Sequence, residues 1–374
     1  MPPETFLRVL ADPSVAERSD ALASIVVAVL TFKRPTELAN FLTDYARIEM
    51  PAGCQVTLLV VDNDARASAR TTVDAWRERI PGVRYVVESR VGIPVARNRA
   101  VREALECHAD ALCFIDDDET PDPQWLVRLV DAWQRSGAHL VGGPVEVATA
   151  PPQASPWQRL INASLASRAR RKYAMTARAA ATGGRYTIVT NNWLCDLHWL
   201  GSNGLRFDER LLLTGGSDTA FHGAAVAAGG RRAWAADAIV RETIGTDRLT
   251  LRYQFWRGIS QSITHFRLKG AQVTPRIILE TFVLATIRAL LGLMLLAIPV
   301  FGVGSLTMGI RSLGWAVGRI RALFGHESRL YAFAAAETAT PAAVSDVADV
   351  AVLGLPSDTT ATGRHQGHSQ RRAA

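Results

Sequence analysis

The sequence predicts an α/β fold built around a mostly parallel sheet. Short runs rich in Val, Ile and Leu alternate with longer stretches of helical spacing, and this alternation is typical of βαβ units. Each run is short enough to be a strand buried on both faces of a sheet. The runs are Ile25–Leu30, Gln55–Val61, Val83–Val87, Ala111–Ile115 and Leu140–Gly143.

The stretches between these runs predict helices that begin near prolines. Pro35, Pro94 and Pro123 each precede apolar residues at helical spacing. Proline is favoured in a first helical turn because its missing N–H leaves no hydrogen bond unmade there. We expect these helices to cover the faces of the sheet.

Composition bounds the class of protein. The 374 residues suffice for one large domain with an appendage or for two domains. A net charge of +7 is too small to indicate nucleic-acid binding, and no basic repeat or stacking motif accompanies it. The four cysteines show no CxxC pair and no zinc spacing, which favours core residues in a reducing compartment. The charged start of the chain is unlike a secretory signal, so we expect a cytoplasmic domain to follow it.

The composition changes along the chain and divides it into four segments. We expect an N-terminal extension, an α/β domain in two halves, a membrane-associated helical segment, and a disordered tail with little apolar periodicity. The expected boundaries are 1–23 for the extension, 24–270 for the domain with halves 24–143 and 144–270, 271–333 for the helical segment and 334–374 for the tail.

The helical segment contains an uncharged stretch, Ala289–Ile310. At about 1.5 Å per residue, a helix of this length crosses a bilayer core of about 30 Å. Basic residues flank both ends, so the positive-inside bias assigns no orientation. Pro299 and several glycines leave a re-entrant or interfacial hairpin open, and a buried core helix is the third alternative.

Arg and Lys also crowd together at residues 168–185. Two interpretations of this segment stay open. It is either a solvated flexible loop or a contact for anionic lipid headgroups or a lipid diphosphate.

Two acidic clusters stand directly after predicted strands, Asp62-Asn63-Asp64 and Asp116-Asp117-Asp118-Glu119. Ligands of open parallel sheets bind outside the carboxyl ends of the strands, so both clusters point to one site. In an extended segment Asp116 and Asp118 face the same side. That spacing suits a hard cation whose remaining ligands are substrate phosphates. A helix N-cap formed by Asp118 or Glu119, with solvated charges, is the alternative.

Several common enzyme motifs are missing from the sequence. No GxGxxG follows the first strand, which counts against a dinucleotide-dependent oxidoreductase. There is also no Walker loop, no GxSxG and no HExxH.

A series of short motifs runs in a fixed order from about residue 25 to residue 260. The motifs are Val29-Leu30-Thr31-Phe32-Lys33-Arg34-Pro35, Val61-Asp62-Asn63-Asp64, Gly92-Ile93-Pro94-Val95-Ala96-Arg97-Asn98, Asp116–Glu119 with Trp125-Leu126, Gly142-Gly143-Pro144-Val145, Thr190-Asn191-Asn192, Phe207-Asp208 and Thr214-Gly215-Gly216-Ser217-Asp218-Thr219-Ala220-Phe221. In this order they resemble family 2 glycosyltransferases of the GT-A fold. The pattern is most similar to bacterial exopolysaccharide glucosyltransferases of the succinoglycan type.

The resemblance implies a donor site in the first half of the domain, for a UDP-sugar such as UDP-glucose. Thr31 and Asp62 would hold the uridine, with Asp64 a weaker candidate. Arg97 and Asn98 would line the donor pocket.

The resemblance also implies a metal and a base. Asp116 would lie near the ribose and sugar, Asp117 would belong to the donor-binding set, and Asp116 and Asp118 would coordinate Mg²⁺ or Mn²⁺. Asp218, in the acceptor half, would be the general base of an inverting transfer. A metal-bound carboxylate is no longer basic, so the metal ligand and the base must be different residues.

One residue departs from the family pattern. Ser217 stands where the family usually has Glu, which puts the positioning of the acceptor in doubt. Judged without the family, Asp218 in a Gly-Gly-Ser-Asp turn is a helix N-cap.

The expected activity is hexosyl transfer to a lipid-linked oligosaccharide or another glycan, at the cytoplasmic face of the inner membrane and in contact with membrane lipid. Polyprenyl phosphate, a protein or a small molecule are alternative acceptors. An inactive membrane assembly partner that binds nucleotide sugar is the alternative from another class. No nucleic-acid partner is expected.

Overall fold

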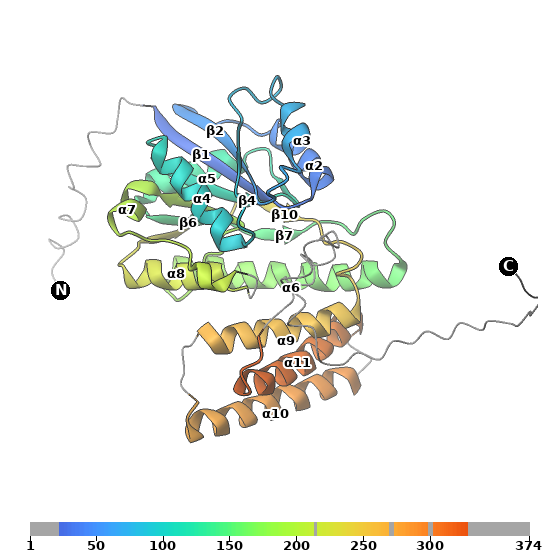
Figure 1. Ribbon diagram of the computed structural model, residues 1–374. Coiled ribbons are helices and arrows are strands. Elements are labelled where there is room, and N and C mark those ends of the chain that lie inside the picture. The colour runs from blue at the N-terminus through green and yellow to red at the C-terminus, as the bar shows by residue number, and fades with distance from the viewer. Residues whose placement is uncertain (1–21, 213–214, 269–272, 298–301, 328–374) are drawn as a thin grey trace, which may run out of the picture. The chain divides into compact units, whose positions relative to one another are not determined.

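The computed structural model describes residues 22–212, 215–268, 273–297 and 302–327. Its centre is a seven-stranded sheet of order β3-β2-β1-β4-β8-β6-β9, and a smaller sheet has the order β5-β10-β7 (Figure 1). The strands are β1 Ala23–Thr31, β2 Cys54–Asp62, β3 Arg84–Val87, β4 Ala111–Asp116, β5 Glu119–Pro121, β6 Leu140–Gly142, β7 Val145–Val147, β8 Asn192–Asp196, β9 Arg232–Trp234 and β10 Val240–Glu242.

The predicted α/β architecture is confirmed. All five apolar runs are strands of the large sheet, and β1 pairs in parallel with both β2 and β4. One strand departs from the parallel pattern, because β8 pairs antiparallel with β4 and with β6. The sheet is therefore mostly parallel with one reversed strand in its second half.

The helices of the domain cover both faces of this sheet. They are α2 Pro35–Tyr45, α3 Arg70–Asp74, α4 Ile93–Glu106, α5 Trp125–Ser136, α6 Pro156–Ala181, α7 Leu197–Ser202, the 3₁₀ turn η2 Glu209–Leu211 and α8 Ser217–Ala227. Successive residues of β1 enter opposite cores, as the period of two along a strand requires. Ile25 and Val27 pack with α2 and α5, whereas Val26 and Ala28 pack with α4 and α7.

The basic segment 168–185 is largely helical, so its interpretation as a flexible loop is wrong. Helix α6 runs to Ala181 and begins with a capping box, in which Ser155 accepts from the Gln158 N–H and Gln158 accepts from the Ser155 N–H. Pro156 occupies the first turn. These signals satisfy backbone donors that would otherwise be unpaired at the helix start.

Three helices follow the domain: α9 Leu251–Leu268, α10 Pro275–Ala297 and α11 Gly302–Leu323 (Figure 1). Glycines let them approach closely, since a Cβ at Gly258 would meet the Arg311 carbonyl and one at Gly314 the Phe255 carbonyl. In α10 and α11 a Cβ at Gly309 would lie 2.9 Å from the Gly292 carbonyl oxygen. Small residues at helix contacts are typical of packing within membranes.

The uncharged stretch 289–310 does not form a single helix. It comprises the end of α10 and the start of α11, and the two helices pack as an antiparallel pair. The hairpin alternative fits this arrangement and the single span does not. Ile259 and Ile263 of α9 pack against α11. The domain boundary at residue 270 stays a prediction.

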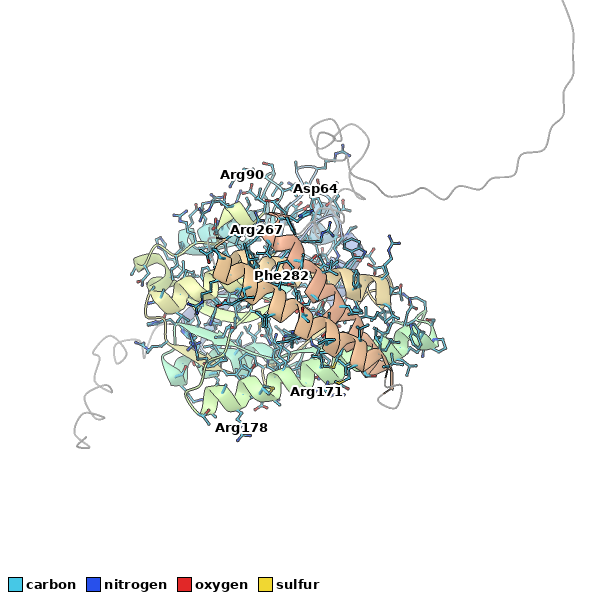
Figure 2. All side chains as sticks on the ribbon, turned by 90° about the horizontal axis from the view of Figure 1, so that it is seen from below. Asp64, Arg90, Arg171, Arg178, Arg267 and Phe282 are labelled. Atoms are coloured by element: carbon cyan, nitrogen blue, oxygen red, sulfur yellow. The ribbon has the colours of Figure 1, made fainter. Side chains whose placement is uncertain are left out.

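Within the described residues, α10 is the one helix long and apolar enough to cross a membrane, and only 17% of its most apolar window is buried. Its exposed side carries large apolar residues, among them Leu279, Phe282, Ile287 and Leu290. Figure 2 views the molecule from below, so that α10 and its labelled residue Phe282 face the reader. Such exposure is unlike the core helix of a soluble protein. The tail, 334–374, lies outside the described residues.

Candidate functional site

The second acidic cluster follows β4 directly. Asp116 is the last residue of the strand, residues 117 and 118 form a turn, and β5 begins at Glu119. Helix α5 has Gln124 as its N-cap. Asp118 and Glu119 are therefore not helix caps, and that alternative is wrong.

The end of β1 contacts this turn. The Thr31 hydroxyl donates to Asp117 over 2.9 Å. The Arg34 guanidinium lies 2.6 Å from an Asp117 oxygen and 3.0 Å from an Asp118 oxygen. Arg248, in the loop before α9, lies 3.8 Å from Asp118. Thr31, Asp117 and Asp118 are thus brought together, and two arginines join them.

Glu242 of β10 completes what we call the acidic group, which comprises Asp116, Asp117, Asp118, Glu119 and Glu242. Glu242 stands opposite Glu119 in the β5–β10 pairing. Burial and then Asp118 raise the pKa of Asp116 to about 7, while Arg97 opposes the shift. Burial also raises the pKa of Asp117 to about 7 against the pull of Arg34. The pKa of Glu242 is raised by burial and by Asp118. These raised pKa values show that ionised carboxylates in the group destabilise one another, and that the neighbouring arginines offset this only in part.

This arrangement fits a divalent cation. In the described part of the chain no set of three Asp, Glu, His or Cys side chains could hold a metal ion alone. The carboxylates of Asp116 and Asp118 nevertheless repel each other, and a cation between them would relieve that repulsion. Hard cations accept carboxylate oxygens, and substrate phosphates can supply the remaining ligands.

The side chains of the first acidic cluster form hydrogen bonds mainly with the loop that follows β2. Asp62 is fully buried and accepts from the N–H groups of Asp64 and Ala69 and from the Tyr85 hydroxyl. Asp64 is 7% exposed. Asn63 accepts from the Gly92 N–H over 2.8 Å and so connects β2 to the start of α4. The donor roles of Asp62 and Asp64 stay predictions.

Two predicted donor-site residues of α4, Arg97 and Asn98, contact different parts of the domain. Arg97 is buried, donates to the Ser217 hydroxyl over 2.9 Å and acts on the charge of Asp116. Asn98 instead donates to the Phe207 carbonyl and to Glu209 and accepts from the Phe207 N–H. Arg97 therefore joins the acceptor half to the acidic group, whereas Asn98 fixes the 207–209 segment.

Asp218 lies in the first turn of α8 and is half-buried. The N-cap is Gly216, whose φ of 89° favours glycine, so the interpretation of Asp218 as a simple cap is wrong. Burial and then Arg168 lower the pKa of Lys172 on α6, while Asp218 and Glu242 act in the opposite direction. Lys172 is thus within electrostatic range of both carboxylates.

Sequence reasoning did not place four residues near the acidic group: Arg34, Glu242, Arg248 and Lys172. Arg34 stands in one of the recognised motifs, so a signal for it existed. Glu242 and Arg248 come from separate elements and carry no local pattern. Lys172 belongs to the basic segment 168–185, a pattern that does not indicate a place beside the acidic group.

We expect Arg34→Ala to destabilise the protein. The change leaves the buried Asp117 without its closest cation, and an unpaired buried charge is costly. Arg34 is partly solvated, so we expect a loss of about 2 kcal/mol rather than the full cost of breaking a buried pair. Thermal melting followed by circular dichroism measures it. Arg47→Ala, which breaks an exposed pair with Asp44, is the control and should change little. Equal melting temperatures for the two variants would contradict the structural role of Arg34.

Comparison with known proteins gives one family and one close relative. Residues 26–196 match the model described as Glycosyl transferase family 2. Over 245 residues the chain is 33% identical to the succinoglycan biosynthesis protein ExoM of Rhizobium meliloti (strain 1021), which covers 65% of this chain and 74% of that one.

Solved structures show weaker likeness. Residues 1–349 of TarS from S. aureus are 13% identical with a TM-score of 0.45, over 81% of this chain and 92% of that one. The mannosyltransferase PcManGT of Pyrobaculum calidifontis, in complex with GDP-Man and Mn²⁺, is 13% identical with a TM-score of 0.46, over 92% and 86%.

Proposed function

Because the chain belongs to glycosyl transferase family 2 and is a glycosyltransferase, we propose that it moves a hexose from a UDP-sugar, with UDP-glucose as the expected donor. The acceptor we propose is a lipid-linked oligosaccharide or another glycan, and the new linkage has inverted configuration. The similarity to a protein of succinoglycan biosynthesis supports an exopolysaccharide product.

The hydrogen bond from Arg97 to Ser217 is the observation that carries this proposal. Arg97 acts on Asp116, and Ser217 precedes Asp218 in the chain. One buried side chain thus links the proposed donor-side carboxylate to the turn that holds the proposed base. Ser217, the departure from the family pattern, has a defined partner, so the turn is held without the usual Glu.

In the proposed reaction Asp218 accepts the proton of the acceptor hydroxyl. The acceptor oxygen forms a bond to the anomeric carbon from the side opposite the diphosphate. The bond from that carbon to the diphosphate oxygen breaks, and UDP leaves with the electron pair. Arg34 and Arg248, which lie beside Asp118, are placed to attract the charge that develops on the diphosphate.

Asp116 and Asp118 would hold Mg²⁺ or Mn²⁺ together with the diphosphate, and the bound cation would supply Lewis-acid stabilisation of the leaving group. Thr31 orients Asp117 through its hydroxyl, and we propose that this pair borders the donor.

We also propose that the enzyme is bound to the cytoplasmic face of the inner membrane. The exposed apolar side of α10 supports this proposal. If the helix lay in water, many large apolar side chains would be in contact with solvent, whereas a membrane would bury them. The close glycine contacts of α11 with α9 and α10 also support a membrane environment, because helices in membranes associate through closely packed small residues.

The test is a panel of nucleotide sugars offered to the full chain purified in detergent. We expect UDP release from one UDP-hexose, dependent on Mn²⁺ or Mg²⁺ and abolished by a chelator. An inactive assembly partner would bind UDP but would cleave none of the UDP-sugars offered. That outcome would end the enzymatic proposal.

A further inference from the structure

The loop 243–250 joins β10 to α9 and carries Arg248, one of the two arginines beside the acidic group. Hydrogen bonds from two helices hold its backbone. Gln158 of α6 donates to the Thr246 carbonyl over 3.0 Å, and Gln254 of α9 donates to the Arg248 carbonyl over 2.8 Å. The second bond acts on Arg248 itself, so Gln254 determines where this guanidinium can reach.

The orientation of Gln254 is set by an arginine of α11. Gln254 is only 2% exposed, and its amide oxygen accepts from the Arg311 guanidinium over 2.6 Å. A guanidinium can only donate hydrogen bonds. If the amide turned over, its NH₂ would face Arg311 and its oxygen would face the Arg248 carbonyl, and both contacts would be repulsive. Arg311 therefore fixes the orientation in which Gln254 holds Arg248.

Helix α11 packs closely against α9 next to this contact. Gly314 and Gly318 are four residues apart and so lie on one face of α11. A Cβ at Gly318 would meet the Ile259 carbonyl, as one at Gly314 would meet that of Phe255. Small residues at this spacing let two helix backbones approach closely. The contact from Arg311 is therefore part of a tightly packed interface.

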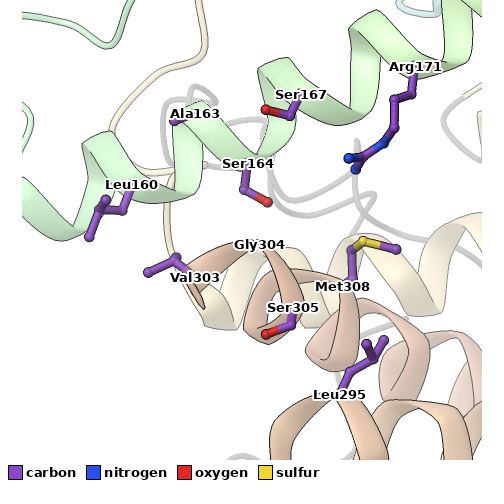
Figure 3. A pocket seen from close by; sticks show the side chains of 10 residues that line it. All are labelled: Leu160, Ala163, Ser164, Ser167, Arg171, Leu295, Val303, Gly304, Ser305 and Met308. Carbon is purple, nitrogen blue, oxygen red and sulfur yellow. The ribbon is translucent and has the colours of Figure 1, made fainter. Parts of the chain in front are cut away.

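The contact of α11 with α6 is looser. Helix α11 contacts α9 more extensively than it contacts α6. Between α6 and α11 lies an open groove, lined by Leu160 and Ser164 of α6 and by Val303 and Met308 of α11 (Figure 3). The hydrogen bonds that connect α11 to the loop thus pass through α9.

Arg311 has a second acceptor on α9. It donates to Gln261 over 2.8 Å. Gln261 is exposed and lies about two helical turns after Gln254, farther from the loop. The bond to Gln261 ties Arg311 to α9, whereas the bond to Gln254 also connects it to Arg248. The two glutamines therefore allow these two effects to be separated.

We propose that Arg311 is a positioning residue for the donor site, which acts through Gln254 on the loop that carries Arg248. The C-terminal helices thereby set the position of a cation beside Asp118. The fixing of the loop depends only on the contacts above. The effect on donor affinity rests on the proposed function, in which Arg248 attracts the diphosphate.

Hydrogen exchange of the full chain in detergent, measured by mass spectrometry, tests whether the loop is held in this way. Arg311→Met removes the donor to Gln254. Gln254→Glu keeps an acceptor for Arg311 but removes the N–H that holds the Arg248 carbonyl. In both variants we expect peptides covering 243–250 to exchange about two- to tenfold faster, the range for the loss of one hydrogen bond.

Gln261→Ala is the matched control, because it removes the other acceptor of Arg311 and leaves the contact with the loop in place. Exchange of 243–250 should not change in this variant. A purely structural role of Gln254 would instead speed exchange throughout α9 and α11. Unchanged exchange of the loop in Arg311→Met and Gln254→Glu, or a uniform increase across both helices in Gln254→Glu, would overturn the proposal.

Calorimetric titration of UDP with Mn²⁺ tests the consequence for the donor. Arg248→Ala should weaken UDP binding about tenfold, the scale of a lost charge-assisted contact. Gln254→Glu should weaken it by no more than that. It should have no further effect in the Arg248→Ala background, because residues that act through one another are not additive.

The titration also separates this proposal from the proposed function. Additive losses in the double variant would show that Gln254 does not act through Arg248 and would overturn the positioning role. If the loop exchanges faster in Gln254→Glu but Arg248→Ala leaves UDP affinity unchanged, the fixing of the loop stands and the proposed diphosphate contact of Arg248 fails.

Discussion

Asp218→Asn is expected to reduce turnover by about 10²–10⁴, the scale of lost general-base catalysis. Asparagine keeps the size of the side chain and most of its hydrogen bonding but cannot accept the acceptor proton. Affinity for UDP with Mn²⁺ should stay within a few-fold, because those contacts are proposed to lie at the strand ends. Steady-state UDP release from the preferred donor measures the effect.

The geometry of α8 sharpens this test. Gly216 is the N-cap, so Asp218→Asn removes no cap and should leave the stability of the helix nearly unchanged. The matched control is Asp131→Asn on the surface of α5, where only an exposed pair with Arg135 is lost. If Asp218→Asn retains more than a tenth of wild-type turnover while folded, Asp218 is not the base.

Asp118→Ala is expected to weaken metal-dependent UDP binding by about 10²-fold or more. Removing a residue that hydrogen-bonds to a metal ligand already lowers metal affinity about 10- to 100-fold. Removing a direct ligand should lower it at least as much. The measurement is calorimetric titration of UDP with and without Mn²⁺.

The metal-free titration distinguishes the metal from the arginines. Asp118 contacts Arg248 and Arg34, so its removal releases Arg248 from this contact and leaves Arg34 paired with Asp117 alone, and both cations then have more capacity for the diphosphate. Without Mn²⁺ the variant should therefore bind UDP no more weakly than the wild type. Unchanged affinity in the presence of Mn²⁺ would remove Asp118 from the metal site.

The first half of the fold was predictable because its strands are nearly continuous Val, Ile and Leu runs. β8 was not recognised, since Asn192–Asp196 is short and bounded by polar residues, and its antiparallel pairing depends on partners far away in sequence. Helix α6 was left open as a loop because it has little apolar periodicity, although the Ser155–Gln158 capping box marked its start.

Site residues that directly follow a predicted strand could be placed from the sequence. Asp116 and Asp118 follow a buried strand, so the edge of the sheet on which they lie is fixed by that strand. Glu242 reaches the group only through the pairing of β10 with β5, and Lys172 only through the packing of α6. Asn98 shows the opposite case, in which a residue of a recognised motif binds a neighbouring loop.

The configuration of the first sugar released tests the central claim most directly. In the absence of a glycan acceptor, water takes the acceptor position, and a single displacement assisted by Asp218 converts UDP-α-glucose into β-glucose. Proton NMR recorded before mutarotation, with the full chain in detergent and Mn²⁺, measures the anomer. We predict that the β-anomer appears first and that Asp218→Asn suppresses it. Initial release of the α-anomer would contradict an inverting transfer with Asp218 as its base.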